Sequence, residues 1–223
     1  MNKGLLIVFE GIDGTGKSTQ MSLLARSLRE KGFAVIETRE PTNGQFGQQI
    51  RALYTNRNGV SPEQELELFL ADRQEHVHNV LTPALQEGKI ILCDRYFLST
   101  AAYQGIGRSS TGAIPGASDT RPSMAVGFSP AEIIAKNDFA PPPDLALLFC
   151  APPRLGIERI TQGRGDTLND FEQEATLQKV ATIFDSLELP YIKRINASGS
   201  IASIHQAVLL AVTPLLQPMS DNA

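Results

Sequence analysis

The sequence predicts an α/β fold, a three-layer sandwich in which a five-stranded parallel sheet carries helices on both faces. Short apolar runs alternate along the chain with longer segments of helical periodicity, the order expected of strand–helix–strand units. The apolar runs are rich in Ile, Leu and Val without alternating polar residues, which indicates strands buried on both faces. The 223 residues contain no internal repeat and no clear linker, so we expect one domain spanning 1–223.

The elements follow one another in a regular order. Each predicted strand is a short apolar run, and the segment after it carries an apolar residue every three or four positions. The clearest helix start has Ser61 as the cap, Pro62 at the first helical position and Gln64 three residues after the cap. The predicted strands are 5–10, 33–38, 89–94, 144–150 and 191–195, and the predicted helices are about 16–31, 62–87, 96–105, 131–136, 153–162, 168–187 and 201–216.

Composition and charge narrow the functional classes. The 20 Lys and Arg against 24 Asp and Glu give a net charge of −4, which lacks the basic excess of a general nucleic-acid binder. Cys93 and Cys150 end apolar runs, where cysteines are usually buried small hydrophobes rather than metal ligands. The chain has no apolar window of 18 residues and no signal-peptide pattern. We therefore expect a cytoplasmic protein without a nucleic-acid or membrane partner, in which any anion site is built locally.

The segment GIDGTGKS, from Gly11 to Ser18, matches the phosphate-binding pattern G-x-x-x-x-G-K-[ST]. It lies between a buried strand and an amphipathic helix, where glycines let backbone amides wrap a phosphate and the helix N-terminus adds positive charge. Lys17 then reaches the β- and γ-phosphoryl oxygens of a nucleotide, and the Ser18 hydroxyl is a hard oxygen ligand suited to Mg²⁺. The residues expected to bind the nucleotide are Gly11, Ile12, Asp13, Gly14, Thr15, Gly16, Lys17, Ser18 and Thr19.

A second element is the end of the predicted strand 89–94, where Asp94 precedes Arg95. The tips of parallel strands border the crevice that binds ligands, so we expect Asp94 near Mg²⁺ and Arg95 on a phosphate. A regulatory GTPase is disfavoured, because 135–138 reads AKND instead of N-K-x-D and no D-x-x-G begins at Asp94. A motor ATPase needs a larger sheet, whereas a small-molecule kinase fits the length.

Four segments resemble the thymidylate kinases, in order and at suitable spacing between about residues 5 and 195. They are EGIDGTGKST at 10–19, TREP at 38–41, FLADR at 69–73, and DRY with STAAYQ within 94–104. The resemblance implies a P-loop kinase fold with a short lid. It also implies transfer of a phosphoryl group from Mg-ATP to dTMP, giving dTDP and ADP for dTTP biosynthesis, by a homodimer.

The resemblance further implies roles in an acceptor site. Phe69 would stack on thymine, and Arg73 would donate to O4, where the amino group of cytosine would be repelled. Because Arg73 falls on the apolar face of its helix, the base would supply the partner that this guanidinium otherwise lacks. Thr100 and Gln104 would face the base edge, and Tyr103 would pack under the deoxyribose. The residues expected to bind dTMP are Asp13, Glu40, Pro41, Arg51, Phe69, Arg73, Arg95, Ser99, Thr100, Tyr103 and Gln104.

The expected cations come from several segments. Arg95 would clamp the acceptor phosphate with help from Arg39 or Arg51, and Asp13 would accept from the sugar 3′-hydroxyl. Some family members carry Arg where this chain has Asp13, so charge on the transferred group must be met from the lid, at about 158–170. The residues assigned to catalysis are Lys17, Asp94, Arg95, Arg164, Arg159 and Asp13, and those assigned to the metal and its waters are Ser18, Glu10 and Asp94.

Departures from the family pattern leave alternatives open. The sequence 42–44 reads TNG where many bacterial members carry Gly-Gly-Thr, and the Gly/Ser-rich loop at about 105–129 is longer than usual. Adenine contacts are suspected around 196–198. The alternatives are a kinase for another deoxynucleotide or nucleoside, a nucleotide-binding switch without turnover, and a catalytically inactive paralogue.

Overall fold

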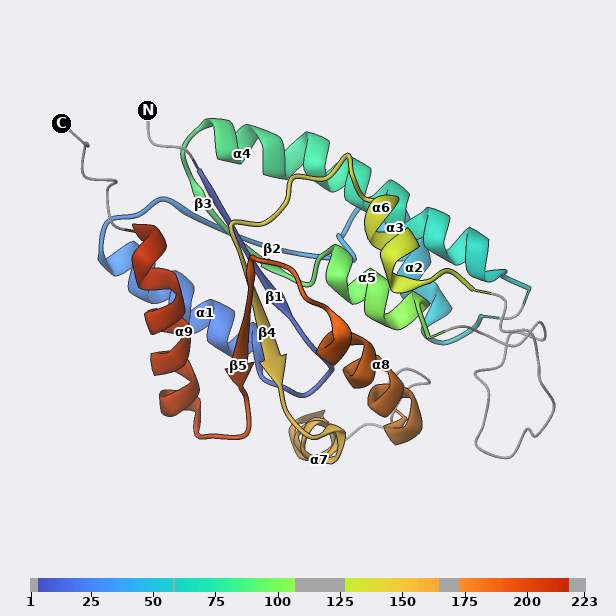
Figure 1. The fold of residues 1–223 in the computed structure, drawn as a ribbon. Coiled ribbons are helices and arrows are strands. Elements are labelled where there is room, and N and C mark those ends of the chain that lie inside the picture. The colour runs from blue at the N-terminus through green and yellow to red at the C-terminus, as the bar shows by residue number, and fades with distance from the viewer. Residues whose placement is uncertain (1–3, 58, 107–126, 165–172, 217–223) are drawn as a thin grey trace.

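The computed structural model describes residues 4–57, 59–106, 127–164 and 173–216 (Figure 1). Within these residues, five parallel strands form one sheet in the order β2-β3-β1-β4-β5, which confirms the predicted fold class. The strands are β1 (Leu5–Glu10), β2 (Val35–Arg39), β3 (Ile90–Asp94), β4 (Leu145–Cys150) and β5 (Ile192–Asn196). Their bounds differ from the predicted ones by at most two residues, which is the ordinary ambiguity in assigning the ends of secondary structure.

Helices cover both faces of the sheet, as Figure 1 shows. They are α1 (Lys17–Glu30), α2 (Gln45–Leu53), α3 (Pro62–His76), the π-helical turn η1 (Val77–Leu81), α4 (Thr82–Gln86), α5 (Phe97–Gln104), α6 (Pro130–Ala135), α7 (Pro153–Arg164), α8 (Glu174–Ser186) and α9 (Ile201–Leu216). The predicted helix 168–187 corresponds to α8, and its part up to 172 lies outside the described residues. None of the described helices is both long and apolar enough to cross a membrane.

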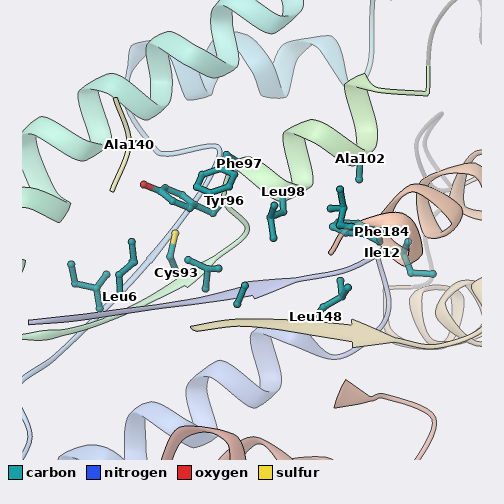
Figure 2. Packing of buried hydrophobic residues seen from close by; sticks show 14 of the residues in the cluster. Leu6, Ile12, Cys93, Tyr96, Phe97, Leu98, Ala102, Ala140, Leu148 and Phe184 are labelled. Carbon is teal, nitrogen blue, oxygen red and sulfur yellow. The ribbon is translucent and has the colours of Figure 1, made fainter. Parts of the chain in front are cut away.

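The two core layers follow from the alternation of side chains along each strand. Ile7 and Phe9 of β1 point to the face covered by α1 and α9, whereas Leu6 and Val8 point to the other face, which α5 and α8 cover. Figure 2 shows this second layer, in which Cys93 is buried among apolar side chains. Cys93 is thus the buried small hydrophobe that its context predicts, and Cys150 is partly buried.

The register of the sheet sets the position of the ligand site. Phe9 of β1 stands beside Asp94 of β3, and Glu10 stands beside Leu148 of β4. The carboxyl ends of the three central strands therefore lie together, and the phosphate loop leaves β1 next to Asp94. In open α/β sheets this edge is where ligands bind.

Two helical segments differ from expectation. The predicted helix 62–87 is helical throughout but widens into η1, just before Pro83. A proline inside a helix removes one amide donor and crowds the carbonyl four residues earlier, which a wider turn relieves. Helix α2 was not predicted, because its nine residues are few for a periodic apolar pattern and Gly47 within it is a poor helix former. A Cβ at Gly47 would come 2.0 Å from the carbonyl oxygen of Thr42, so this helix packs against the segment after β2 through bare backbone.

Candidate active site

A cavity of about 740 Å³ opens at the carboxyl ends of the strands, within the size range of small-molecule sites. Every residue that the sequence assigns to dTMP lines this cavity, and so do residues 13–19 of the phosphate loop. Gly11 and Ile12 do not line it. Asp94 and Arg159 border the same space, so side chains from the whole length of the described chain converge here.

The phosphate loop is pressed against α7. Gly14 has a φ of 75°, and a Cβ there would come 2.1 Å from the carbonyl oxygen of Gly156. Gly156 is confined in turn, because its own Cβ would come 2.5 Å from the carbonyl oxygen of Asp13. Glycine is needed at both positions because the two backbones touch without side chains between them.

Lys17 begins α1 and places its ammonium group over the loop. Its Nζ donates to the carbonyl oxygen of Ile12 (2.7 Å), and the Thr15 hydroxyl donates to the same oxygen (2.8 Å). Burial, and to a lesser degree the positive charge of Arg95, lower the pKa of Lys17 to about 8, against the opposing effect of nearby carboxylates. The Lys17 amine is therefore largely protonated near pH 7 and suited to donate hydrogen bonds to a phosphate oxygen.

Ser18 and Asp94 form a pair of oxygen ligands beside the loop. The Ser18 hydroxyl donates to Asp94 Oδ2, and both residues line the cavity. A hydroxyl and a carboxylate fit Mg²⁺, which usually takes few protein ligands and completes its shell with water and phosphate oxygens. Among the described residues, no group of three His, Cys, Asp or Glu could hold a metal by itself.

Glu10 occupies a different place from the one predicted in the metal shell. Its Oε1 accepts from the backbone N–H groups of Tyr96 (3.0 Å) and Ser99 (3.2 Å), and its Oε2 accepts from the Ser99 hydroxyl. Glu10 is fully buried and does not line the cavity. Burial raises its pKa to about 7, although the hydrogen bonds from Ser99 act in the opposite direction. Glu10 thus holds the N-terminus of α5 against the end of β1.

Arg95 adopts a strained backbone conformation with a φ of 70°, which non-glycine residues rarely take. Its Nη2 donates to Asp13 Oδ1 (2.7 Å), and its Nη1 donates to the Ser99 hydroxyl (3.0 Å). Tyr103 donates to the other oxygen of Asp13 (2.8 Å). Burial alone would raise the pKa of Asp13, but the charges of Arg95 and Lys17 outweigh it and hold the pKa at about 2.

Arg73 is buried in a polar network, contrary to the expectation that it lacks a partner. Its Nε and Nη2 donate to Glu40 Oε2 (2.9 and 2.5 Å), and Nη2 also donates to the Thr100 hydroxyl (2.9 Å). Its Nη1 donates to Asn137 Oδ1 (2.5 Å). Glu40 also accepts from His76 Nδ1 (2.9 Å). The guanidinium is therefore paired without a ligand, and it still lines the cavity.

Further side chains line the cavity near Arg73. Phe69 stands one turn before Arg73 on α3. Gln104 donates through Nε2 to Glu65 Oε1 (3.1 Å), and its buried Oε1 has no partner among the described residues. Tyr54 also lines the cavity, although the sequence did not single it out, because a tyrosine after a missed helix gives no signal.

Residues 41–43, which follow β2, accept hydrogen bonds from two more arginines in the cavity wall. Arg51 donates through Nη1 to the carbonyl oxygens of Pro41 (3.1 Å) and Thr42 (2.6 Å). Arg39 donates to Asn43 Oδ1 (3.2 Å). The segment that departs from the family pattern is thus tied to both cations predicted near the acceptor phosphate.

The opposite end of the cavity is lined by Arg159, Gly199 and Ile201. Arg159 donates to the carbonyl oxygen of Ala197 (2.9 Å), so the segment suspected of adenine contacts touches α7. Gln20, which the sequence analysis did not name, donates to the carbonyl oxygen of Ile201 (2.9 Å). The backbone of Arg164 ends α7, but its side chain lies outside the described part of the structure, as do 165–170 of the predicted lid and most of the predicted loop 105–129.

Comparisons with known proteins agree with this geometry. A family model described as thymidylate kinase matches residues 9–114. A thymidylate kinase from Desulfotalea psychrophila is 52% identical over 216 residues, covering 97% of this chain and 98% of the relative. Thymidylate kinases from Xanthomonas euvesicatoria pv. vesicatoria and Xanthomonas campestris pv. campestris are each 40% identical, over 222 and 219 residues. These matches cover 99% and 96% of this chain and 88% and 87% of the relatives.

Proposed function

The chain belongs to the thymidylate kinase family, and from this premise we propose that it transfers the γ-phosphoryl group of Mg-ATP to dTMP, giving dTDP and ADP. One observation carries the proposal above all. A single cavity joins a phosphate loop to a buried set of polar side chains whose donors and acceptor match thymine. ATP bound at one end of the cavity and dTMP bound at the other would bring their phosphate groups together.

The ATP end acts through charge and position. The loop backbone and the Lys17 ammonium would bind the β- and γ-phosphates. Ser18 and Asp94 would hold a Mg²⁺ ion, whose charge neutralises the phosphate oxygens. Phosphoryl transfer needs little covalent chemistry from the protein, so this alignment supplies most of the rate enhancement.

The acceptor phosphate would lie near Arg95. This guanidinium is held by Asp13 and Ser99 at a fixed point between the loop and α5, and Arg39 and Arg51 stand on the same wall. Asp13 stays ionised at neutral pH and can accept from the sugar 3′-hydroxyl. The negative charge that develops during transfer would be met by Lys17, by Arg159 and, as the family pattern implies, by Arg164 of the lid.

The base end would read thymine by its hydrogen-bond pattern. Arg73 offers N–H donors to the O4 carbonyl, and the unpaired Gln104 Oε1 can accept from N3–H. Cytosine has an amino group at position 4 and an acceptor at N3, so both contacts would be reversed. Phe69 would stack on the ring.

Substrate specificity tests the proposal. Purified protein is incubated with Mg-ATP and, separately, dTMP, dUMP, dCMP, dGMP or thymidine, and release of ADP is followed. We expect dTMP to exceed dCMP in kcat/KM by about tenfold or more, because the wrong base leaves buried polar groups unpaired. Preference for another acceptor would favour the alternative kinase. GTP binding without acceptor-dependent turnover would favour a nucleotide-binding switch.

We further propose that the protein is a cytoplasmic homodimer that requires no nucleic-acid partner. The dimer and the cellular location rest on family membership, and a net charge of −4 supports the absence of a general nucleic-acid surface. Light scattering after size-exclusion chromatography would test the dimer. A mass equal to that of one 24.2 kDa chain would contradict it.

A further inference from the structure

Asn137 is a buried residue that none of the expected roles includes. It follows α6, and only 2% of its surface is exposed. Its Nδ2 donates to the carbonyl oxygen of Ile133 (2.7 Å), and its Oδ1 accepts from Arg73 Nη1 (2.5 Å). The two ends of an amide side chain are often exchanged in assignment. Here the orientation is fixed, because a carbonyl oxygen only accepts and a guanidinium only donates.

The position of Asn137 is set by the helices that form the base end. α6 begins with a capping box in which Ser129 and Glu132 exchange hydrogen bonds. Ile133, one turn before Asn137, is fully buried against Leu66 of α3 and Ala101 of α5. α6 is thus packed onto the same two helices that carry Arg73 and Thr100, and the hydrogen bond to Ile133 ties Asn137 to it.

The donors of Arg73 show what Asn137 contributes. A guanidinium has five N–H groups. Nε and Nη2 are occupied by Glu40 and Thr100, and one N–H of Nη1 is occupied by Asn137. The second N–H of Nη1 donates to no acceptor among the described residues and is the donor left for a ligand in the cavity. Asn137 holds the very nitrogen that keeps a free hydrogen.

We propose that Asn137 is a positioning residue that aims Arg73 at the carbonyl oxygen at position 4 of the acceptor base, and so helps to determine pyrimidine specificity. The inference rests on the proposed function, because it concerns the same acceptor site. Without Asn137, Glu40 and Thr100 still hold Nε and Nη2, but no acceptor holds Nη1, so the planar guanidinium can tilt about these contacts and carry Nη1 away from its place. The 4-carbonyl is then bound less well, and the 4-amino group of cytosine is excluded less strictly.

Two substitutions separate this role from simple packing. Asn137→Leu removes both hydrogen bonds of the side chain at similar volume. Asn137→Asp also loses the bond to Ile133 but keeps an acceptor for Arg73. For Asn137→Leu we expect KM for dTMP to rise about tenfold, the size of one hydrogen bond to a charged group, with kcat nearly unchanged. The ratio of kcat/KM between dTMP and dCMP should fall by a similar factor, and Asn137→Asp should restore most of both.

Several controls keep the test decisive. Calorimetry of dTMP and dCMP binding without ATP reports the same discrimination apart from turnover. In an Arg73→Leu background, adding Asn137→Leu should change discrimination little, because the residue acts through Arg73. Asn79→Leu makes the same chemical change at an exposed position of η1 and should leave both substrates unaffected. If Asn137→Leu does not fold, Asn137→Ala takes its place in the comparison with Asn137→Asp.

The outcomes distinguish the inference from the function on which it rests. A wild-type protein without preference for dTMP over dCMP would count against the proposed function. A wild-type preference that survives unchanged in Asn137→Leu would overturn the inference alone. The inference would also fail if Asn137→Asp were as impaired as Asn137→Leu, since the bond to Ile133 would then explain the loss.

Discussion

The two ends of the cavity are built in different ways. The phosphate end is made mainly of consecutive backbone groups, with glycines where the chain must approach other backbone, and one lysine that begins a helix. The base end is made of buried side chains from distant segments, of which Glu40, Arg73, Thr100 and Asn137 are the centre. The difference teaches that substitution should affect the two ends differently. The phosphate end should lose activity with little loss of stability, whereas the base end should lose both.

The largest expected effect is on the stability of the base end. Glu40→Ala leaves the buried Arg73 without its carboxylate and His76 without its acceptor. Removing one partner of a buried pair costs about 3–5 kcal/mol of unfolding free energy, which lowers Tm by about 10 °C in a protein of this size. Thermal and urea unfolding would measure it. Glu37→Ala, which breaks the exposed pair with Arg29, is the matched control and should cost less than about 1 kcal/mol. Equal losses in both variants would remove the distinction.

The next effect is on the rate at the phosphate end. Lys17→Ala should lower kcat by about 10²–10³, the usual cost of losing a group that meets developing charge. Its Tm should change little, because Lys17 contributes a single hydrogen bond to the loop. Initial rates of ADP release and a thermal scan test both halves of this expectation. Lys31→Ala, at the exposed end of α1, serves as the control. An active but unstable Lys17 variant would break the comparison.

A pH effect concerns the joint between the two ends. Glu10 ties β1 to α5, and its pKa in the folded protein is raised from 4.5 to about 7. The folded state therefore holds this proton more tightly than the unfolded state. The stability from the neutral carboxyl is fully present below about pH 4.5 and is lost as the pH rises through 7, by roughly 3 kcal/mol.

Unfolding of Glu10→Gln measured from pH 5 to 8 would test this assignment. The amide keeps an oxygen for the two backbone donors but does not titrate, so its stability should decline less over this range than that of the wild type. Glu30→Gln, at an exposed position, should follow the wild-type curve. Asp13 has the opposite sign, because its pKa is lowered from 3.8 to about 2. Its contribution to stability is present above about pH 3.8 and is lost as the pH falls from there through 2. Parallel curves for Glu10→Gln and the wild type would contradict the role of Glu10.

The smallest effect is expected from Phe69. Phe69→Leu removes the aromatic face but keeps an apolar side chain on α3. Loss of base stacking typically costs about 1–3 kcal/mol when the ring is cut back to alanine. Leucine keeps part of the apolar contact, so we expect a loss near about 1 kcal/mol, which raises KM for dTMP about five- to tenfold while KM for ATP stays constant. Phe33→Leu, at a partly buried position outside the cavity wall, is the control. A change in the KM of ATP instead would place Phe69 at the wrong end.

The same division explains what the sequence could predict. The phosphate loop and Asp94 could be predicted because each directly adjoins a buried strand in the sequence. A strand of five or six apolar residues is itself a local signal. The partners of Arg73 could not be predicted, since Glu40 and Asn137 lie 33 and 64 residues away in the sequence. A buried arginine signals that some partner exists, but only the fold shows which one.

Two further differences between the sequence-based expectations and the structure have local causes. The sequence 135–138 was rejected as a guanine-binding motif, and this left Asn137 without any expected role. Glu10 adjoins the phosphate loop in sequence and was therefore placed near the metal. In the structure its side chain points across to the N-terminus of α5, because the free amides there need an acceptor.

The contact between Gly14 and Gly156 has a consequence for how this enzyme can change. The two glycines are 142 positions apart, yet each leaves no room for a methyl group on the other's segment. Neither position can gain a side chain unless the helix beneath the loop is displaced as a whole. A designer who transplants this loop into another scaffold must therefore also transplant the turn of α7 that contains Gly156, because neither segment fits without the other.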